Sequence, residues 1–229
     1  MLPTDSVHLG WCSFAAVWLR HTPSTIPGHI IACFSTGEVR AAFERQAAED
    51  WKTFLSCRAR EMRPGARLVI VLPAMAEGRP TGFMNFVDCV NTVLGEMADE
   101  GAITAQERAR MVLGVYARRL DELLTPFEGN GQFQRLMVED CETAPLPDPA
   151  WVDYQQDGDK QALATKQALF FRSVFMPSLA SALTRVRAGN LETMHSFADR
   201  LQDHLTHCLA SHPISADLFV QMLVLAKSE

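Results

Sequence analysis

The sequence lacks a run of about 18 apolar residues, the length that a membrane-spanning helix requires. Its first residues, MLPTDSV, lack the basic region and apolar core of a signal peptide. Lysine and arginine form no run, and the formal net charge of −6 argues against binding to nucleic acid or to an anionic membrane surface. What remains is a chain of 229 residues with 48% hydrophobic residues, enough to fold as one large domain or as two small domains.

Cysteine pairs of the C-x-x-C type are also missing. The six cysteines stand singly, at positions 12, 33, 57, 89, 141 and 208. Isolated cysteines in apolar patterns are typical of intracellular proteins. We therefore expect reduced thiols in a cytoplasmic protein rather than a disulfide framework.

Several catalytic and nucleotide-binding motifs do not occur. There is no G-x-G-x-x-G pattern, no phosphate-binding loop, and no G-x-S-x-G turn to carry a hydrolase serine. The glycines of EGNGQF, residues 128–133, precede an expected strand rather than a helix, so they indicate a turn. The sequence therefore gives no motif in support of a phosphate-loop enzyme or a serine hydrolase.

Two groups of polar residues resemble functional sites only weakly. His204, His207 and Cys208 share a helix face, but no fourth ligand is apparent, so we expect no metal site and solvated histidines. Asp140 and Glu142 share one face of an alternating strand, which we expect to be the solvated face rather than an acid–base pair.

Apolar periodicity predicts an α/β fold, in which helices separate the strands of an open sheet. The five apolar residues 68–72 predict a strand that is buried on both faces, as in a parallel sheet. Strands are expected at residues 5–12, 28–34, 66–74, 131–144 and 217–227, and helices at 14–20, 35–63, 83–100, 104–110, 120–127, 163–176 and 190–208.

Local signals set some of the expected boundaries. Ser35 and Glu38 have the spacing of a capping box at the start of the long helix, and Asn190 is placed to cap the last one. Pro177 is expected to begin a new helix. The sheet core is then assigned to residues 1–74, 131–144 and 214–229, a helical cap to 75–128, and further helices to 160–212.

The stretch SFAAVWLRHTP, which begins at Ser13, follows the first expected strand. It places Phe14 and Trp18 four residues apart on an expected helix, where two rings can belong to the core or form the wall of a pocket. Ligands of open α/β sheets gather beyond the C-terminal ends of the strands, which favours the pocket. Tryptophan adds one indole N–H donor to a flat apolar wall, a combination that suits a small aromatic acid.

Read in order, the segments resemble the SABATH family of plant-type carboxyl methyltransferases, which methylate salicylate, jasmonate, benzoate and related acids. AAEDWKTFLSCRAREMRPGARLVIVL is similar to the family's long helix, its FL-x-CR-x-x-E-x-x-PGG turn and the following strand. LGEMADEGAI, VYARRLDEL, GQFQRLMVEDCE and FFRSVFMPSL match further family segments in the same order, over nearly all of the chain.

The resemblance implies a fold and a set of roles. The expected fold is the C-terminal part of a Rossmann-like class I methyltransferase sheet, with about four main strands and a helical cap. Cys12 and Ser13 fall where the family's turn lines the site of S-adenosylmethionine (SAM). Phe14 takes the place of a pocket tyrosine, Val17 matches a pocket wall, and Trp18 matches the tryptophan that holds the substrate carboxylate.

Further pocket positions come from the helical segments. Phe86 and Val87 fall near the family's Ile-Trp pair, and Phe171 and Val174 match two apolar positions that shape the acid's pocket. Both pocket substitutions, to Phe14 and Val87, indicate a different or larger acid. Where some members carry an Asp-x-Phe-Asn metal site, this chain has residues 109–112, ARMV, which cannot ligate Mg²⁺, so no metal is expected.

The family's N-terminal cofactor motifs have no counterpart, because the chain begins where the family's fourth strand begins. The resemblance implies SAM-dependent methyl transfer to the carboxylate of a small acid by the full-length protein, and weak SAM binding by this chain alone. The alternative is an inactive remnant or interaction module that pairs through its open sheet edge, with a homodimer as one form.

Overall fold

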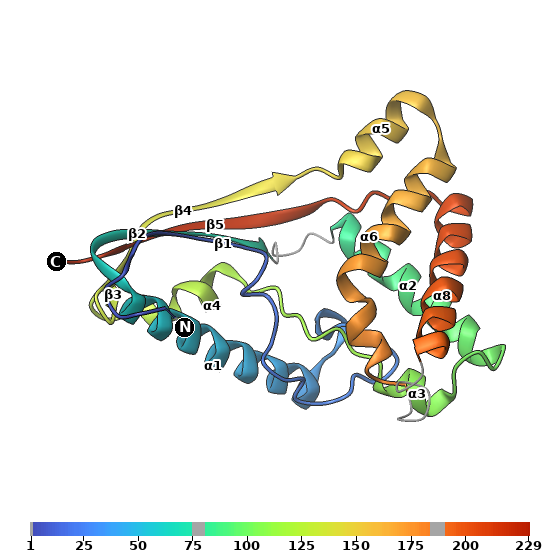
Figure 1. Ribbon diagram of the computed structural model, residues 1–229, viewed down its shortest axis with the longest axis horizontal. Helices are drawn as coiled ribbons and strands as arrows, with labels where there is room; N and C mark the ends of the chain where they lie inside the picture. The colour runs from blue at the N-terminus through green and yellow to red at the C-terminus, as the bar shows by residue number, and fades with distance from the viewer. Residues whose placement is uncertain (1, 75–80, 184–190) are drawn as a thin grey trace.

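The computed structural model describes residues 2–74, 81–183 and 191–229. Their strands form one mixed sheet in the order β1-β2-β5-β4-β3. Figure 1 shows this sheet at one end of the molecule and most of the helices at the other. The elements are β1 (Val7–Ser13), η1 (Ala32–Phe34), α1 (Gly37–Glu61), β2 (Met62–Ala74), α2 (Gly82–Asp99), α3 (Ala105–Arg110), α4 (Leu120–Leu124), η2 (Thr125–Phe127), β3 (Gln132–Phe133), β4 (Leu136–Leu146), α5 (Pro149–Asp157), α6 (Lys160–Ala180), α8 (Leu191–Ser211) and β5 (Leu218–Lys227).

The α/β fold class is confirmed, with a mixed rather than a parallel sheet. β1 and β2 are parallel and α1 connects them, while β5 runs antiparallel to both β2 and β4. The expected strand at 131–144 is a hairpin of β3 and β4, because Gln134 and Arg135 both adopt positive φ angles, of 47° and 72°, that reverse the chain.

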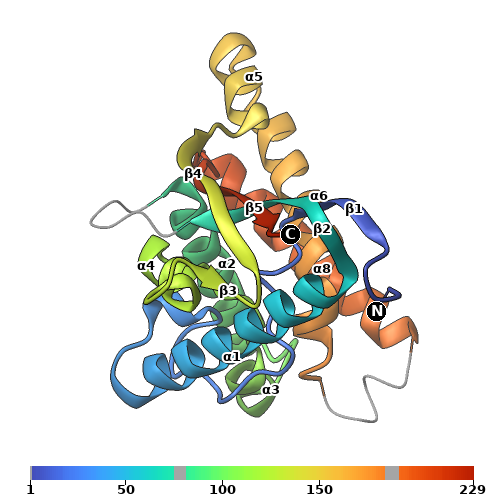
Figure 2. The same cartoon turned by 90° about the vertical axis from the view of Figure 1, so that its left-hand side faces the viewer.

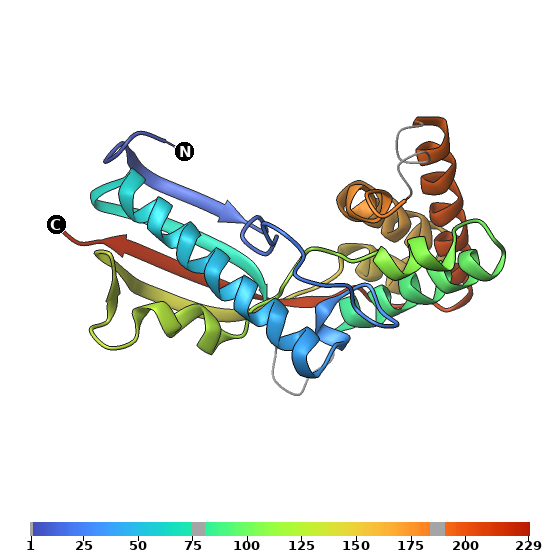
Figure 3. The same cartoon turned by 90° about the horizontal axis from the view of Figure 1, so that it is seen from below.

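Only one face of the sheet carries a helix among the described residues. Figures 1 and 3 show α1 lying along that face. On β2, Leu68, Ile70 and Leu72 are buried against α1, whereas Val69 and Val71 on the opposite face are half-buried. The expectation of a strand buried on both faces was therefore wrong.

The open face is most exposed at β1. Leu9 and Trp11 each expose 71% of their surface, and β1 pairs with β2 alone among the described strands. The other edge of β1 therefore has backbone N–H and C=O groups without a strand partner in the described chain.

The helices form a core of their own at the C-terminal ends of β1 and β2. In Figure 2 the helices α2, α6 and α8 lie behind the sheet. Phe86, Leu94, Phe171 and Leu201 are among their completely buried side chains. None of the described helices is long and apolar enough to cross a membrane.

Several local expectations were wrong. Residues 28–34 form a turn and η1 rather than a strand. Thr36, not Ser35, precedes α1, and the Ser35 hydroxyl donates to the Ala32 carbonyl, so the expected capping box is absent. The expected cap Asn190 lies outside the described residues.

Pro177 lies inside α6 and does not begin a new helix. Proline in a helix interior costs about 3 kcal/mol. Phe175, Met176 and Leu179, on either side of it, are buried in the helical core, and each such side chain contributes about 1.5–3 kcal/mol. Burial of these three side chains outweighs the missing backbone hydrogen bond.

All six cysteines are free thiols. Cys89 on α2 and Cys208 on α8 face each other, with their sulfur atoms 2.8 Å apart. Cys208 packs against the helical core.

Candidate functional site

An apolar cavity of about 300 Å³ lies where the sheet meets the helices. Phe14, Val17, Trp18 and Val174, four of the predicted pocket residues, line it together. Most of the other walls are also apolar: Ile31, Pro73, Ala74, Phe83, Met84, Val115, Ala117, Phe170, Phe175 and Leu218.

The segment after β1 carries three of these residues and is an irregular turn, not the expected helix. Phe14 has a φ of 57°, a left-handed conformation that costs a side chain about 1–2 kcal/mol. Its N–H donates to the Val71 carbonyl at 2.8 Å, and the Val17 carbonyl accepts the Tyr116 N–H at 2.9 Å. These bonds to other elements outweigh the local preference for a helix.

Trp18 lines the cavity and is partly exposed. Its ring centroid lies 5.8 Å from that of Phe175, and 37% of the residue remains exposed. None of the hydrogen bonds in the described part of the chain uses its indole N–H. One donor is therefore free at the wall of an apolar cavity.

The cavity's polar wall comes from residues that the sequence did not single out. Arg40 donates to the Tyr116 hydroxyl at 3.0 Å and to Glu44 at 2.9 Å, and Tyr116 donates to Glu122 at 2.7 Å. Cys33 lies on the same wall.

These polar groups are poor proton acceptors. Burial raises the pKa of Cys33 to about 11, although the nearby Arg40 charge opposes the rise. Burial also raises the pKa of Tyr116, and its hydrogen bond to Glu122 adds to the effect. Both groups stay protonated at neutral pH, so neither provides a general base.

Three predicted pocket residues do not line this cavity. Val87 and Phe171 are buried in the helical core, with 0% and 1% exposure. Phe86, also at 0%, contributes to the wall of an adjoining hollow of about 540 Å³ that shares Phe14 and Phe170 with the cavity. In this structure Val87 and Phe171 belong to the helical core and not to the cavity wall.

The two residues predicted to contact SAM end β1. Ser13 is exposed and pairs with Val71, whereas Cys12 is half-buried against the core between the sheet and α1. Ser13 is thus accessible beside the cavity residue Phe14, and Cys12 turns toward the covered face. Their cofactor role stays a prediction.

The weaker candidate sites do not assemble. The described residues contain no group of three metal-ligating side chains, and His204 lies 3.7 Å from Glu100. Asp140 and Glu142 are exposed on β4, as predicted for a solvated face.

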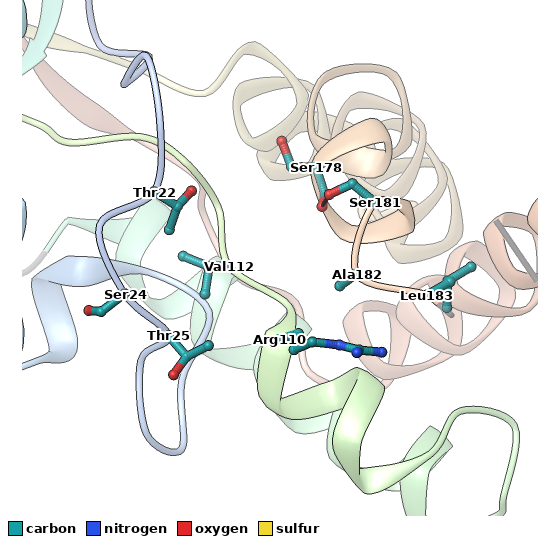
Figure 4. A pocket seen from close by; sticks show the side chains of 9 residues that line it. All are labelled: Thr22, Ser24, Thr25, Arg110, Val112, Ser178, Ser181, Ala182 and Leu183. Carbon is teal, nitrogen blue, oxygen red and sulfur yellow. Dashed lines mark hydrogen bonds between the residues drawn. The ribbon is translucent and has the colours of Figure 1, made fainter. Parts of the chain in front are cut away.

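A larger hollow of about 560 Å³ lies between the loop after β1 and the end of α6. Figure 4 shows the hydroxyl groups of Ser24 and Thr25 pointing away from the facing helix end. Ser181 donates its hydroxyl to the Ser178 carbonyl. The polar groups of this hollow do not point toward a common centre, so the apolar cavity is the better candidate site.

Comparisons with known proteins agree with this geometry. A probable caffeine synthase of Camellia sinensis is 23% identical over 223 residues, which cover 92% of this chain and 56% of that protein. Loganic acid O-methyltransferase of Catharanthus roseus is 25% identical over 162 residues, covering 64% of this chain and 42% of the relative. The chain thus spans about half the length of the curated relatives it matches.

A solved structure of a loganic acid methyltransferase with SAH has the same fold. It superposes with a TM-score of 0.71 at 22% sequence identity, over 100% of this chain and 63% of that one. The sequence profile for SAM-dependent carboxyl methyltransferases matches residues 1–227. The chain therefore belongs to the SAM-dependent carboxyl methyltransferase family.

Proposed function

We propose that the full-length protein transfers a methyl group from SAM to the carboxylate of a small acid bound in the apolar cavity. The observation that carries this proposal is the indole N–H of Trp18, which has no partner among the described residues, on a residue that lines an apolar cavity. None of the described lining residues is a carboxylate or a histidine that could serve as a general base. A carboxylic acid has a reference pKa near 4, so at neutral pH it is already a nucleophile and needs no base.

The cavity limits the size of the acid. Its volume of about 300 Å³ equals roughly ten water molecules at about 30 Å³ each. An acid with about ten non-hydrogen atoms and an apolar body therefore fits. Relatives named for loganic acid and farnesoic acid support an acid substrate, whereas the caffeine synthases keep a nitrogen acceptor open.

The chain's own residues would orient the acid and exclude water. The Trp18 N–H would donate to one carboxylate oxygen, while Phe14, Val17 and Val174 form the dry wall around the acid's body. SAM, when bound, supplies an electrophilic methyl group on sulfur. Ser13, exposed at the end of β1, would contact that group. Transfer requires the carboxylate oxygen to lie within about 3–3.5 Å of the methyl carbon, in line with its bond to sulfur.

A methyl-transfer screen of small aromatic and fatty acids with the full-length protein tests this function. Trp18→Phe keeps an aromatic ring but removes the donor, so we expect at least a tenfold loss of kcat/KM. Trp151→Phe, on α5 far along the chain, serves as the matched control and should keep full turnover. Unchanged turnover in Trp18→Phe would reject the carboxylate role of this residue.

A second proposal concerns the chain on its own. The exposed Leu9 and Trp11, and the β1 edge beside them, favour binding to a further protein segment or to a second copy. We propose that the isolated chain binds SAM weakly and associates through this edge. Micromolar SAM binding in calorimetry would contradict the weak binding, and a monomer at high concentration in light scattering would contradict the association.

We also propose a cytoplasmic location and a small-molecule acid as the partner of the cavity. Six free thiols support the location, since disulfides are rare in the cytoplasm. Thiol labelling of the protein in intact and lysed cells tests it.

A further inference from the structure

Arg118 is a buried arginine that forms no ion pair within the described part of the chain. It lies between α3 and α4, exposes 3% of its surface, and has no carboxylate within 4 Å among the described residues. Removing a cation from water costs several kcal/mol unless other groups compensate. A buried guanidinium that is not ion-paired therefore calls for a structural reason.

Backbone carbonyls take the place of the missing carboxylate. Arg118 donates to the Ala16 carbonyl at 2.7 Å and to the Ala47 carbonyl at 2.7 Å. Its guanidinium lies 5.7 Å from the centre of the Trp51 ring, and its backbone forms a bridge with Ala74. One side chain thus joins the turn after β1 to α1, next to the end of β2.

The charges around Arg118 belong to groups that hold the same turn or its neighbours. Asp50 on α1 is 8% exposed and accepts the Arg20 N–H at 2.9 Å and the Gln46 amide at 2.9 Å. Burial lowers the pKa of Arg118, and the charges of Asp50 and Glu122 oppose that effect. Asp50 therefore balances Arg118 from a distance and fixes the other end of the turn.

The two anchors hold backbone positions next to the cavity residues. Ala16, held by Arg118, lies between Phe14 and Trp18 in the sequence, and Arg20, held by Asp50, follows Trp18 by two residues. The turn has an irregular backbone, so its own hydrogen bonds do not fix its conformation. The side-chain anchors add to the backbone hydrogen bonds with Val71, Gly114 and Tyr116, and together they hold the turn.

We propose that Arg118 is a positioning residue of the acid site, and that its hydrogen bond to the Ala16 carbonyl sets the Phe14 and Trp18 rings at the cavity wall. The inference rests on the proposed acid-binding function of that cavity. Arg118 does not touch the acid; it acts through the turn. Lysine cannot replace it, because an ammonium group lacks the planar fork that reaches two carbonyls at once.

The test uses the four tryptophans as reporters. The protein is labelled with 5-fluorotryptophan, and the four ¹⁹F resonances are assigned with single Trp→Phe variants. Arg118→Lys keeps the charge and Arg118→Ala removes it. We expect both to move or broaden the Trp18 resonance before any acid is added, while the exposed Trp11 resonance stays in place.

Acid binding and chemical rescue separate positioning from general damage. With benzoate and octanoate as probes, we expect Arg118→Lys to weaken the Kd read from the Trp18 resonance about tenfold. Guanidinium ion at about 20 mM should return the Trp18 resonance of Arg118→Ala toward the wild-type position, whereas sodium at the same ionic strength should not. Arg119→Lys, at a half-buried neighbour paired with Asp121, is the matched control and should leave Trp18 unchanged.

A folded Arg118→Lys protein with the wild-type Trp18 resonance and an unchanged Kd would overturn the inference. If Arg118→Ala fails to fold, the lysine variant still decides. Failure of the wild-type Trp18 resonance to respond to any acid would instead count against the proposed function. The resonance position without acid tests Arg118 in either case.

Discussion

Alanine at Gly82 and alanine at Gly95 should change stability in opposite directions, although both glycines lie on α2. A Cβ atom at Gly82 would lie 2.2 Å from the Ser215 carbonyl oxygen and 2.4 Å from Asp217 Oδ1. The first neighbour is backbone, so no side-chain rotation relieves the contact, and α2 or the segment before β5 must shift by about 1 Å. At Gly95 nothing lies within 4 Å of the added methyl group.

The expected magnitudes follow from these contacts. Overpacking typically costs about 1–3 kcal/mol, and a backbone clash belongs at the upper end, so Gly82→Ala should destabilise the protein by about 3 kcal/mol. Gly95→Ala should stabilise it by about 0.5–1 kcal/mol, because alanine is the better helix former. For a protein of this size, 1 kcal/mol shifts Tm by about 2–4 °C, which predicts a drop of about 6–12 °C and a rise of about 1–4 °C.

Thermal and urea denaturation of the two variants measure both effects. Thr81, Phe83 and Met84, around Gly82, line the cavity, so Gly82→Ala should also weaken acid binding, while Gly95→Ala should leave it intact. If Gly82→Ala were as stable as the wild type, the start of α2 and the segment before β5 would have to lie farther apart than they do in the structure.

Three further predictions concern buried groups. Burial alone would raise the pKa of Glu61, but the Leu2 N–H and the Arg58 guanidinium hold this pKa below its ordinary value. The contribution of the Glu61 carboxylate to stability is therefore present above pH 4.5 and is lost as the pH falls. Urea denaturation should show that Glu61→Gln is less stable at neutral pH and loses less stability on acidification. Trp51 donates to the buried Leu123 carbonyl at 3.0 Å, so Trp51→Phe should cost about 2–3 kcal/mol in urea denaturation, whereas Trp151→Phe on the poorly buried α5 should cost less than about 0.5. Because the pKa of Cys33 is raised to about 11, peptide-resolved mass spectrometry should find its alkylation at pH 8 roughly a hundredfold slower than that of an exposed thiol with a pKa near 8.5.

Long periodic helices and strands could be predicted from the sequence because the pattern of their own side chains determines their secondary structure. The apolar periodicity of residues 35–63 predicted α1, and the apolar run at 68–72 predicted β2. Residues 14–20 could not be predicted in this way. Their conformation depends on hydrogen bonds to Val71, Gly114, Tyr116 and Arg118, between about 55 and 105 positions away in the sequence.

The candidate site was predictable to a similar extent. Phe14, Val17, Trp18 and Val174 were found because strand ends and family segments mark them, and they meet at one cavity. Phe170 was missed although it lies one helical turn before Val174, at the spacing that puts two residues on one face.

Other residues of the site left no local signal. Phe171 was favoured over Phe170, but Phe171 packs on Phe175, 5.3 Å away, within the helical core. Arg40 lies in the first turn of α1, and the approach of Tyr116 from a distant part of the sequence makes it part of a cavity wall. Packing between segments that are distant in the sequence decides whether each of these two residues lines the cavity. No local sequence pattern reports that packing.

The two proposed surfaces should separate in mutational tests, because they lie on different sides of the turn after β1. Trp18→Phe and Arg118→Lys act on the cavity wall, so they should weaken acid binding and leave SAM binding and association unchanged. Trp11→Lys places a charge on the open sheet face, so it should disturb association or SAM binding by the full-length protein while the cavity keeps its affinity for acids. If Trp11→Lys abolished acid binding as well, the cavity would depend on whatever covers β1, and the acid site could not be treated as a structure that this chain completes by itself.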